Sequence, residues 1–537
     1  MKKKWKILSE KKEDIIQTLL SNRGLVAKKD IGQFLHSEHP GEFTAKDVDI
    51  DPQALKKAIA RIHKAIKKKE SIVVYADYDA DGITAGAIMW ETIHAMGGNV
   101  MPYIPHRVEE GYGLSVKGID AVREQYDPSL IITVDHGITA YKNVAYAKSL
   151  GIDVIVTDHH VKPDKLPECC IVHTTSLCGA GVSWFVANAL SGNCELLALA
   201  SIGTIADIVS LTGANRSIVK YGLKQLNQTR RVGILALLRD AGLTVGELTT
   251  YDVSHMLAPR LNAMGRLVHA MDALRLLCTH RQDKAMLLAR KLGLTNKERQ
   301  QLTIDTSVHA KNIVHERLKE GLPKLLFVSH ESYNQGVIGL VAGKLVEEYY
   351  RPAIVVAQGP EVSKASARSI PGFNIVEAIK SCSDILVDVG GHPMAAGFTV
   401  ETKNLTELQS RLEKLADKKL TDELLTRELR IDMELPLAAI TGELWQKIRD
   451  FEPFGFGSPE PVFVTRGVTV SDVRLVGADG KHLKLRVSSI DAIAFGMGDL
   501  YPKVKTGKPI DIAYTIDMNT WNGRKSLQLK LRDIMVQ

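Results

Sequence analysis

The sequence SIVVYADYDADGIT, residues 71–84, places an apolar run directly before an acidic loop. The run Ser71–Ala76 is apolar almost throughout, which indicates a strand that is buried on both faces of a sheet. Asp77, Asp79 and Asp81 follow at alternate positions, and a helical pattern begins soon after them. A buried strand, a loop and a helix in this order predict one repeat of a parallel α/β sheet.

Later segments repeat the same pattern. Residues 100–104, 130–134 and 153–157 are further short apolar runs, and helical patterns separate them. Continuous apolar strands that alternate with helices predict a parallel sheet with helices on both faces. We therefore expect the fold class α/β for the first half of the chain.

The 537 residues are too many for a single hydrophobic core, so the chain should divide into domains. Residues 284–319 lack proline and strand-like runs, which suggests a long connecting helix or a pair of helices. A second α/β block begins near Leu322, and short alternating runs after Pro461 suggest a small antiparallel barrel or sandwich. The expected domains are an N-terminal helical segment, an α/β domain, a helical connector, a second α/β domain and a C-terminal β-barrel, at residues 1–70, 71–225, 226–320, 321–420 and 430–537.

The composition is that of an ordinary globular protein, with 45% hydrophobic and 24% charged residues. No apolar run approaches the roughly 18 residues that would span a bilayer, so we expect no membrane segment. Charged residues stand where an N-terminal signal peptide would need its apolar stretch. The six cysteines include no C-x-x-C pair, which favours a reduced, cytoplasmic protein over a disulfide or zinc framework.

The net charge of +7 favours polyanionic partners only mildly. Basic residues crowd residues 56–69, where Leu55, Ile59, Ile62 and Ile66 recur at helical spacing. An amphipathic helix is the expected structure of this segment. Its basic face is either an ordinary solvated surface or a contact for nucleic acid, and the sequence leaves both open.

Acidic and imidazole side chains follow several apolar runs. We expect these runs to be strands of one sheet, whose carboxyl ends bind ligands in open α/β folds. Carboxylates this close to one another repel unless a cation neutralises them. Oxygen and imidazole ligands suit Mn²⁺, and Mg²⁺ is the alternative. The candidate positions are Asp77, Asp79, Asp81, Asp135, His136, Asp158, His159, His160 and Asp207.

The motifs DYDADG, VDHG, TDHH and ADIV, in this order, resemble the four motifs of the DHH phosphoesterase superfamily. Within it, the chain is similar to the RecJ family of single-strand-specific 5′→3′ DNA exonucleases. Further matching segments include YIPHRVEEGYGL (103–114), LAPRLNAMGRL (257–267), SARSIPGF (366–373), GGHPMAAGF (390–398) and PFGFGSPEPVF (453–463). The resemblance implies a DHH domain, a DHH-associated domain and an OB-fold.

The resemblance also implies the roles of individual residues. A centre of two divalent cations would be held by Asp79, Asp81, Asp135, His159 and Asp207, with Asp135 between the ions. Asp77 would be either another ligand or a hydrogen-bond acceptor next to the ligands. Asp158 would orient the histidines, and His160 would face the scissile phosphate.

Substrate binding is expected mainly in the second α/β domain. A tight turn is predicted at Gly390, Gly391, His392 and Pro393. It is either a site for a phosphate oxygen or a glycine-rich turn with a structural histidine. The resemblance adds binders of the DNA 5′ end and nearby phosphates, which are Arg107, Arg266, Ser366 and Arg368. In the OB-fold, Tyr501, Tyr514 and Trp521 are either stacking platforms for bases or part of the barrel core.

Some positions depart from the RecJ pattern. Tyr333 and Asn334 stand where the family usually has Trp-His, and His136 stands where cysteine is common. These departures leave the expected ligands intact, and they concern specificity.

The function expected from the resemblance is metal-dependent hydrolysis of single-stranded DNA to mononucleotides in recombination and repair. Its expected partners are single-stranded DNA, a single-strand-binding protein and a helicase. Two alternatives are a related phosphodiesterase that acts on short RNA or small nucleotides, and an inactive scaffold. The barrel argues against a small substrate, and the intact motifs argue against an inactive scaffold.

Overall fold

The computed structural model describes residues 3–9, 14–107, 109–192, 195–317, 321–521 and 524–536. The chain forms two compact units. The larger unit comprises Lys6–Gly293 and Arg430–Gln537, and the smaller one comprises Met1–Trp5 and Leu294–Leu429.

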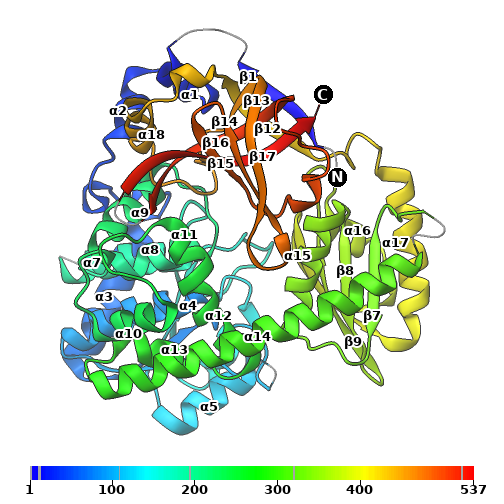
Figure 1. Ribbon diagram of the computed structural model, residues 1–537. Helices are drawn as coiled ribbons and strands as arrows, with labels where there is room; N and C mark the ends of the chain where they lie inside the picture. Colours follow the sequence, from blue (N-terminus) through cyan, green and yellow to red (C-terminus); the bar gives the residue numbers. More distant parts are fainter. Residues whose placement is uncertain are drawn as a thin grey trace. The chain divides into compact units, whose positions relative to one another are not determined.

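A five-stranded parallel sheet lies in the larger unit. Two helices of this unit that pack against the sheet, α3 (Pro52–Lys68) and α4 (Ala80–Ala95), are labelled in Figure 1. Its strand order is β3-β2-β4-β5-β6. Although β2 is the first of these strands in the chain, it pairs with β3 on one side and with β4 on the other. Such a reversal of strand order opens a crevice at the carboxyl ends of the two strands, which here are β2 and β4. The strands are β2 (Ser71–Ala76), β3 (Asn99–Tyr103), β4 (Leu130–Val134), β5 (Asp153–Asp158) and β6 (Cys170–His173).

Helices pack on both faces of this sheet. Alternate residues of β2 belong to different cores, since Val73 and Tyr75 pack with one set of helices and Ile72 and Val74 with the other. The first face is covered by α5 (Val116–Tyr126) and α6 (Tyr141–Ser149). The second face is covered by α3 (Pro52–Lys68), α4 (Ala80–Ala95) and α7 (Gly179–Ser191).

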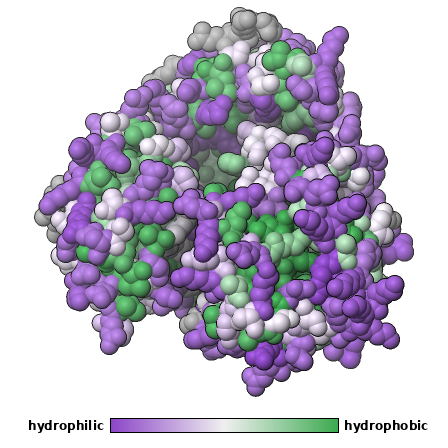
Figure 2. Space-filling view, turned by 180° about the vertical axis from the view of Figure 1, so that it is seen from behind, coloured by the Kyte–Doolittle hydropathy of each residue, from purple (hydrophilic) through white to green (hydrophobic). Residues whose placement is uncertain are grey.

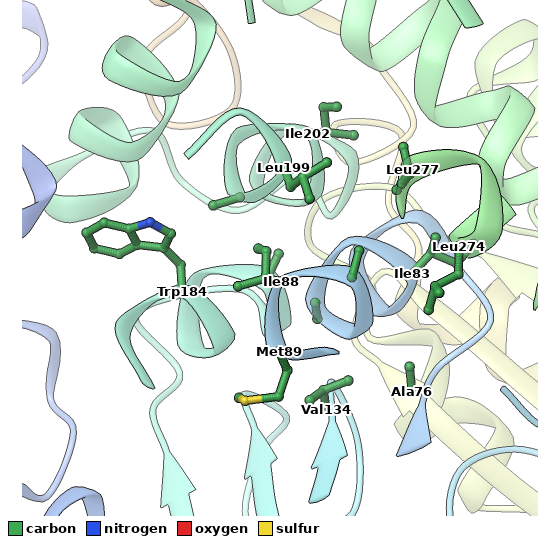
Figure 3. Close-up of a cluster of buried hydrophobic side chains, with 14 of the residues drawn as sticks. Ala76, Ile83, Ile88, Met89, Val134, Trp184, Leu199, Ile202, Leu274 and Leu277 are labelled. Atoms are coloured by element: carbon green, nitrogen blue, oxygen red, sulfur yellow. The ribbon is translucent and has the colours of Figure 1, made fainter. Parts of the chain in front are cut away.

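The helix α4 lies in the middle of the second core, where Figure 3 shows its side chains Ile83 and Ile88. Leu199 and Ile202 of α8 (Leu197–Ala206) belong to the same core. Because α4 and α8 are apolar on nearly all sides, both are buried along most of their length. This rigid packing fixes the two helix ends that border the crevice.

After α8, the chain forms a series of further helices, from α9 to α14. The long helix expected within residues 284–319 is α14, which has 36 residues. A π-helical segment, Val253–Leu257, precedes α12. The helices are α9 (Gly213–Leu226), α10 (Val232–Ala241), α11 (Thr250–Asp252), α12 (Ala258–Leu267), α13 (Met271–Cys278) and α14 (Gln282–Arg317).

The smaller unit contains a second five-stranded sheet of order β10-β11-β9-β8-β7. Only β7 and β8 are parallel, and the other pairs are antiparallel. The tight turn expected at Gly390–Pro393 lies slightly later in the chain, because Gly390–His392 end β10 and pair with β11, and Pro393 and Met394 form the turn of this hairpin. The elements are β7 (Leu326–His330), α15 (Ile338–Tyr349), β8 (Ala353–Ala357), β9 (Val362–Arg368), α16 (Ile375–Lys380), β10 (Leu386–His392), β11 (Ala395–Glu401) and α17 (Leu405–Lys419).

The C-terminal strands form a closed five-stranded barrel. The pairing runs from β13 through β14, β15, β17 and β16, and a further pairing of β16 with β13 closes the ring. Closure leaves these five strands without a free edge, as in an OB-fold. The strands are β13 (Phe463–Val476), β14 (His482–Val487), β15 (Ile490–Ala494), β16 (Pro509–Trp521) and β17 (Arg524–Val536). The expected α/β class with a C-terminal barrel is confirmed.

The first 70 residues contribute to different cores. Leu19, Leu20 and Phe34, from α1 (Ile15–Asn22) and α2 (Lys28–Leu35), pack in the barrel core together with α18 (Gly442–Arg449). The helix α3 instead packs in the core of the α/β domain. The remaining strands are β1 (Lys4–Ser9) and β12 (Glu428–Glu434).

Among the described residues, no helix is long and apolar enough to cross a membrane. Hydrophilic side chains cover most of the face seen in Figure 2, with hydrophobic patches between them.

Candidate metal centre

The acidic loop lies where β2 meets α4. Asp79 is the N-cap of α4, and its Oδ1 accepts a hydrogen bond from the backbone N–H of Gly82 at 3.0 Å. The Oδ1 atom of Asp77 accepts a hydrogen bond from the N–H of Tyr78 at 2.8 Å. A Cβ atom at Gly82 would lie 2.6 Å from the backbone oxygen of Asp77. The tight path of the loop therefore needs glycine at this position.

The N-terminus of α7 holds the third aspartate of the loop. The backbone N–H groups of Gly179 and Ala180 donate to the two carboxylate oxygens of Asp81 at 2.7 and 2.8 Å. A helix N-terminus suits a negative charge, because its free N–H groups point at the anion. A Cβ atom at Gly179 would also lie only 2.4 Å from the Cβ of Asp135. Glycine thus lets the helix approach both acids.

Asp135 follows β4 directly and has a left-handed backbone conformation, with φ of 65°. Its N–H donates to the carbonyl of Thr157 at 3.1 Å, which ties it to β5. The side chain is buried, and among the described residues its Oδ1 atom has no hydrogen-bond donor. A buried oxygen without a donor is the expected state of a cation ligand.

The imidazole of His159 lies among three carboxylates. Its Nε2 atom is 3.1 Å from Asp135 Oδ1, 3.9 Å from Asp81 Oδ2 and 3.8 Å from Asp207 Oδ2. Burial lowers the pKa of His159 despite the nearby charge of Asp81, so the neutral, ligand-competent imidazole is favoured.

Asp207 reaches this cluster from a helix. It is the C-cap residue of α8, so the expectation of a fourth strand end is wrong. The apolar run before it is buried on all sides, and a short run of that kind has the same composition in a strand and in a buried helix.

The imidazole of His160 pairs with Asp158 and not with the clustered aspartates. Its Nδ1 atom is 2.7 Å from Asp158 Oδ1, and its Nε2 atom is 3.5 Å from the hydroxyl oxygen of Tyr112. The Oδ1 atom of Asp158 also accepts from the N–H groups of His159 and His160, and its Oδ2 accepts from the N–H of Ile138. Asp158 is therefore a buried anchor for the whole TDHH segment.

The shifted pKa values of Asp158 and His160 favour an ion pair between the two side chains. Burial alone would lower the pKa of His160, but the hydrogen bond to Asp158 and its charge raise this pKa to about 9. Burial would raise the pKa of Asp158, yet the same hydrogen bond and the backbone donors hold it well below its ordinary value. The pair is thus a carboxylate and an imidazolium at neutral pH.

Four further aspartates of the site are buried close to other carboxylates. Burial and then the charge of a neighbouring aspartate raise the pKa values of Asp77, Asp79 and Asp135. The same two causes raise the pKa of Asp207 to about 8. Bound cations would remove this repulsion. Three overlapping sets of ligand atoms, each within 4.8 Å, are Asp77-Asp79-Asp135, Asp81-His159-Asp207 and Asp135-His159-His160. Their mixture of oxygen and imidazole nitrogen fits Mn²⁺ or Mg²⁺.

Two predicted DNA-binding arginines border the centre. The guanidinium of Arg107 lies 5.0 Å from the centroid of the Tyr78 ring, next to the acidic loop. Arg266 lies in α12, and its charge lowers the pKa of Asp79, opposing its burial.

The other predicted binders lie in the smaller unit. Ser366 and Arg368 are two residues apart on β9, and Arg368 Nη1 donates to Ser366 Oγ at 3.2 Å. A Cβ atom at Gly339 would lie 2.9 Å from that Oγ atom, so glycine makes room for the pair. Gly390, Gly391 and His392 are exposed at the end of β10.

Sequence reasoning missed contacts that hold these residues. Asn262 Oδ1 accepts from the N–H of Ala80 at 2.7 Å, which joins α12 to the acidic loop. Glu110 accepts from the hydroxyl of Tyr103 at 2.5 Å and from the N–H of His106 at 2.9 Å. Glu110 thereby braces the loop that carries Arg107. Both residues lie in segments that match the RecJ pattern, but spacing alone gives them no role.

The candidate stacking residues differ in position. Tyr514 is fully buried and shares a hydrogen bond with Thr465, so it belongs to the barrel core. Tyr501 is 43% exposed. The side chain of Trp521 lies outside the described part of the chain.

His136 does not join the ligands. It is buried, its Nε2 atom lies 3.0 Å from the carbonyl oxygen of Tyr75, and burial lowers its pKa to about 4.

Comparison with known proteins places this geometry in a family. Models of the DHH family N-terminal domain, the DHHA1 domain and the RecJ OB domain match residues 71–208, 321–418 and 431–533. The single-stranded-DNA-specific exonuclease RecJ of Bacillus subtilis is 38% identical, over 97% of this chain and 68% of that protein. RecJ of Salmonella typhimurium is 33% identical, over 89% of each chain. The chain belongs to the RecJ family.

A solved RecJ family structure supports the fold assignment. RecJ of Thermus thermophilus in complex with Mn²⁺ has a TM-score of 0.84 and 29% identity, and the match covers 99% of this chain and 79% of that one. The same protein has been solved in complex with Mg²⁺. The expected membership in the RecJ family, with DHH, DHH-associated and OB domains, is confirmed.

Proposed function

We propose that this chain is a metal-dependent 5′→3′ exonuclease that hydrolyses single-stranded DNA to mononucleotides. The observation that carries the proposal is the convergence of Asp81, Asp135, His159 and Asp207, with the adjacent acidic loop, at one end of a parallel sheet. Buried acids that repel one another support a cation centre, and the RecJ relatives are named single-stranded-DNA-specific exonucleases.

The proposed ligands are Asp77, Asp79, Asp81, Asp135, His159 and Asp207, which would hold two divalent cations, Mn²⁺ or Mg²⁺. When bound, such ions activate a water molecule and neutralise the charge of a phosphodiester during in-line displacement. The amides of α7 orient the carboxylate of Asp81 for this task. His159, which is neutral, offers its Nε2 lone pair.

His160 has a separate role in the proposal. Asp158 holds its Nδ1–H, so the protonated ring presents Nε2–H on the other side. A fixed imidazolium of this kind stabilises negative charge that develops on phosphoryl oxygens. Asp158 thus acts on the substrate only through His160.

Arginines and backbone groups would bind the strand. Arg107 and Arg266 lie next to the centre and suit the phosphates beside the scissile bond, because a guanidinium fork matches a phosphate. We assign the 5′-end phosphate to Ser366 and Arg368, and a further phosphate contact to Gly390, Gly391 and His392. The closed barrel supports a long substrate, since a mononucleotide or short RNA needs no strand-holding domain.

Family membership also supports a proposed cellular context. We place the activity in recombination and repair in the cytoplasm. Its proposed protein partners are a single-strand-binding protein and a helicase.

The test is a product analysis on single-stranded DNA labelled at its 5′ end. With Mn²⁺ or Mg²⁺, labelled mononucleotide should appear first, and chelation of the metal should stop the reaction. Cleavage of short RNA or small nucleotides alone would favour the other phosphodiesterase activity. No hydrolysis of any phosphodiester with either ion would refute the proposal.

A further inference from the structure

One helix of this chain carries a dense cluster of basic side chains. Residues 52–69, which are α3 and its C-cap, contain seven cationic side chains and no acidic one. Without these seven, the chain would have 62 basic and 62 acidic residues, and its net charge of +7 would vanish. The seven are Lys56, Lys57, Arg61, Lys64, Lys67, Lys68 and Lys69.

The helix separates its two faces cleanly. Ala58, Ile62 and Ala65 are fully buried in the core of the α/β domain. The six lysines are all exposed, and we refer to them as the α3 basic face.

Among the described residues, no acidic side chain forms an ion pair with any of these lysines. Arg61 is the exception on this helix, since it pairs with Glu70 at 2.8 Å and with Asp153 at 2.7 Å.

This arrangement costs helix stability. Lys64 and Lys68 are four residues apart, and Lys64 and Lys67 are three apart, so like charges face each other along the helix. Opposite charges pair at the same spacing in Glu407–Arg411 of α17 and Glu443–Lys447 of α18, whereas α3 carries no acidic side chain that could form such a pair. An anionic partner would relieve the repulsion on α3.

The position of the α3 basic face separates it from the metal centre. The C-terminal end of α3 leads through Glu70 into the start of β2, whereas the acidic loop follows the other end of β2. A six-residue strand is about 20 Å long, so Lys67–Lys69 lie at the opposite edge of the sheet from Asp77. Since helices cover both faces of the sheet, a strand bound at the centre has to pass around the domain to reach them.

We propose that the α3 basic face is an accessory binding surface for the sugar–phosphate backbone of long single-stranded DNA, away from the catalytic centre. The proposal rests on the function proposed above. Lysine ammonium groups on flexible stems neutralise phosphates without reading bases, so the contact is independent of sequence and weakened by salt. It raises the local concentration of substrate for a protein whose remaining residues are neutral overall.

The test compares two variants of the full chain with equal charge. The first is Lys64→Gln/Lys67→Gln/Lys68→Gln, which keeps helix-forming residues on α3. The control is Lys414→Gln/Lys418→Gln/Lys419→Gln, which removes three exposed lysines from α17. Circular dichroism and thermal unfolding establish that both variants are folded. Affinity is measured in EDTA for 3′-labelled oligothymidylates of about 6 and about 40 nucleotides, over a range of salt concentrations.

The α3 variant should bind the long oligonucleotide more weakly than the wild type, and its log–log salt slope should be shallower by about 2. Between 50 and 200 mM salt, the wild type should then lose on the order of tenfold more affinity than this variant. Its affinity for the short oligonucleotide and the properties of the α17 control should be unchanged. An unchanged slope, an equal loss in the control, or an equal loss on the short oligonucleotide would each overturn the proposal.

A degradation assay separates this inference from the function on which it rests. Wild type and both variants should degrade the short oligonucleotide at the same rate with Mn²⁺. If the wild type fails to degrade it, the proposed function fails. If the wild type degrades it but the slopes do not differ, only the accessory surface is refuted.

Discussion

Asp135 combines a strained backbone with a buried, repelled carboxylate. Its left-handed conformation and raised pKa both destabilise the metal-free protein. We expect Asp135→Asn to lower kcat by about a hundredfold or more, because it removes a ligand charge. Asparagine tolerates the left-handed conformation, so the fold should survive.

Calorimetric titration of Mn²⁺ and steady-state kinetics check this prediction. Asp164→Asn, at an exposed aspartate, is the matched control and should retain wild-type activity. More than about a tenth of wild-type activity in Asp135→Asn would contradict the assigned role.

The Asp158–His160 pair predicts a pH dependence. If His160 acts as an imidazolium, kcat/KM should fall as pH rises through about 9, where the ring loses its proton. Asp158→Asn removes the charge that raises this pKa, so the fall should move to lower pH. The measurement is the pH profile of both proteins with Mn²⁺, and a basic limb at the same pH in both would assign it to another group.

A substitution at Glu110 tests whether the position of Arg107 matters for substrate binding. Its carboxylate joins Tyr103 to the backbone of His106, so Glu110→Gln should loosen the loop that carries Arg107. We expect KM for single-stranded DNA to rise about tenfold while kcat changes less than about twofold. Glu109→Gln, at the exposed neighbouring position, should leave both constants unchanged. A fall in kcat alone would place Glu110 in the chemistry instead.

Residues of this kind mark the limit of sequence reasoning. The acids Asp77, Asp79, Asp81 and Asp135 could be found, because they follow buried strands and their repulsion requires a cation. The contact between Asn262 and Ala80 joins residues 182 positions apart, and no local pattern reports it. The roles assigned to the arginines come from the family resemblance. A single arginine in a sequence does not distinguish a DNA-binding position from an ordinary surface position.

At the level of elements, the apolar strands are predictable and one apolar helix is not. The strands β2, β4 and β5 are short, continuous and rich in β-branched residues, and the prediction of a parallel sheet from them is confirmed. The helix α8 is equally apolar because it is buried on all sides, so its sequence predicts a strand as readily as a helix. For β10, the predicted turn begins too early, because Gly390 and Gly391 are residues typical of turns but continue the strand here.

The close approach of the N-terminus of α7 to Asp135 can be tested by a substitution at Gly179. Gly179→Ala would place a methyl group 2.4 Å from the Cβ of Asp135, so α7 should shift away from Asp81. We expect at least about a tenfold loss of Mn²⁺ affinity, because the amides that orient Asp81 would move.

Gly343→Ala is the matched control. Gly343 lies in α15 with open space around its Cβ position, so this variant should be stabilised by about 0.5–1 kcal/mol. Calorimetry with Mn²⁺ and thermal unfolding measure both effects. Wild-type metal affinity in Gly179→Ala would show that the helix approach is not needed.

Across the larger unit, Arg216 of α9 joins the α/β domain to the barrel. Its buried guanidinium donates to the carbonyls of Phe34, Phe451, Glu452 and Pro453 and lies 3.8 Å from the Phe34 ring centroid. Burial lowers the pKa of Arg216 to about 10, which leaves it charged at neutral pH. Every acceptor is a backbone carbonyl, so the contact fixes the position of chain segments from three parts of the sequence.

Removing this side chain should weaken the connection between the two domains. Arg216→Met leaves several buried carbonyls without donors, and we expect a loss of about 3 kcal/mol or more in the free energy of unfolding. Arg216→Lys should recover only part of it, because an ammonium cannot reach acceptors in several directions. Thermal unfolding with hydrogen exchange measures the effect, with Arg230→Met at an exposed position as the control. Exchange should rise first at the amides of Phe451 and Glu452, and uniform protection with wild-type stability would contradict the connecting role.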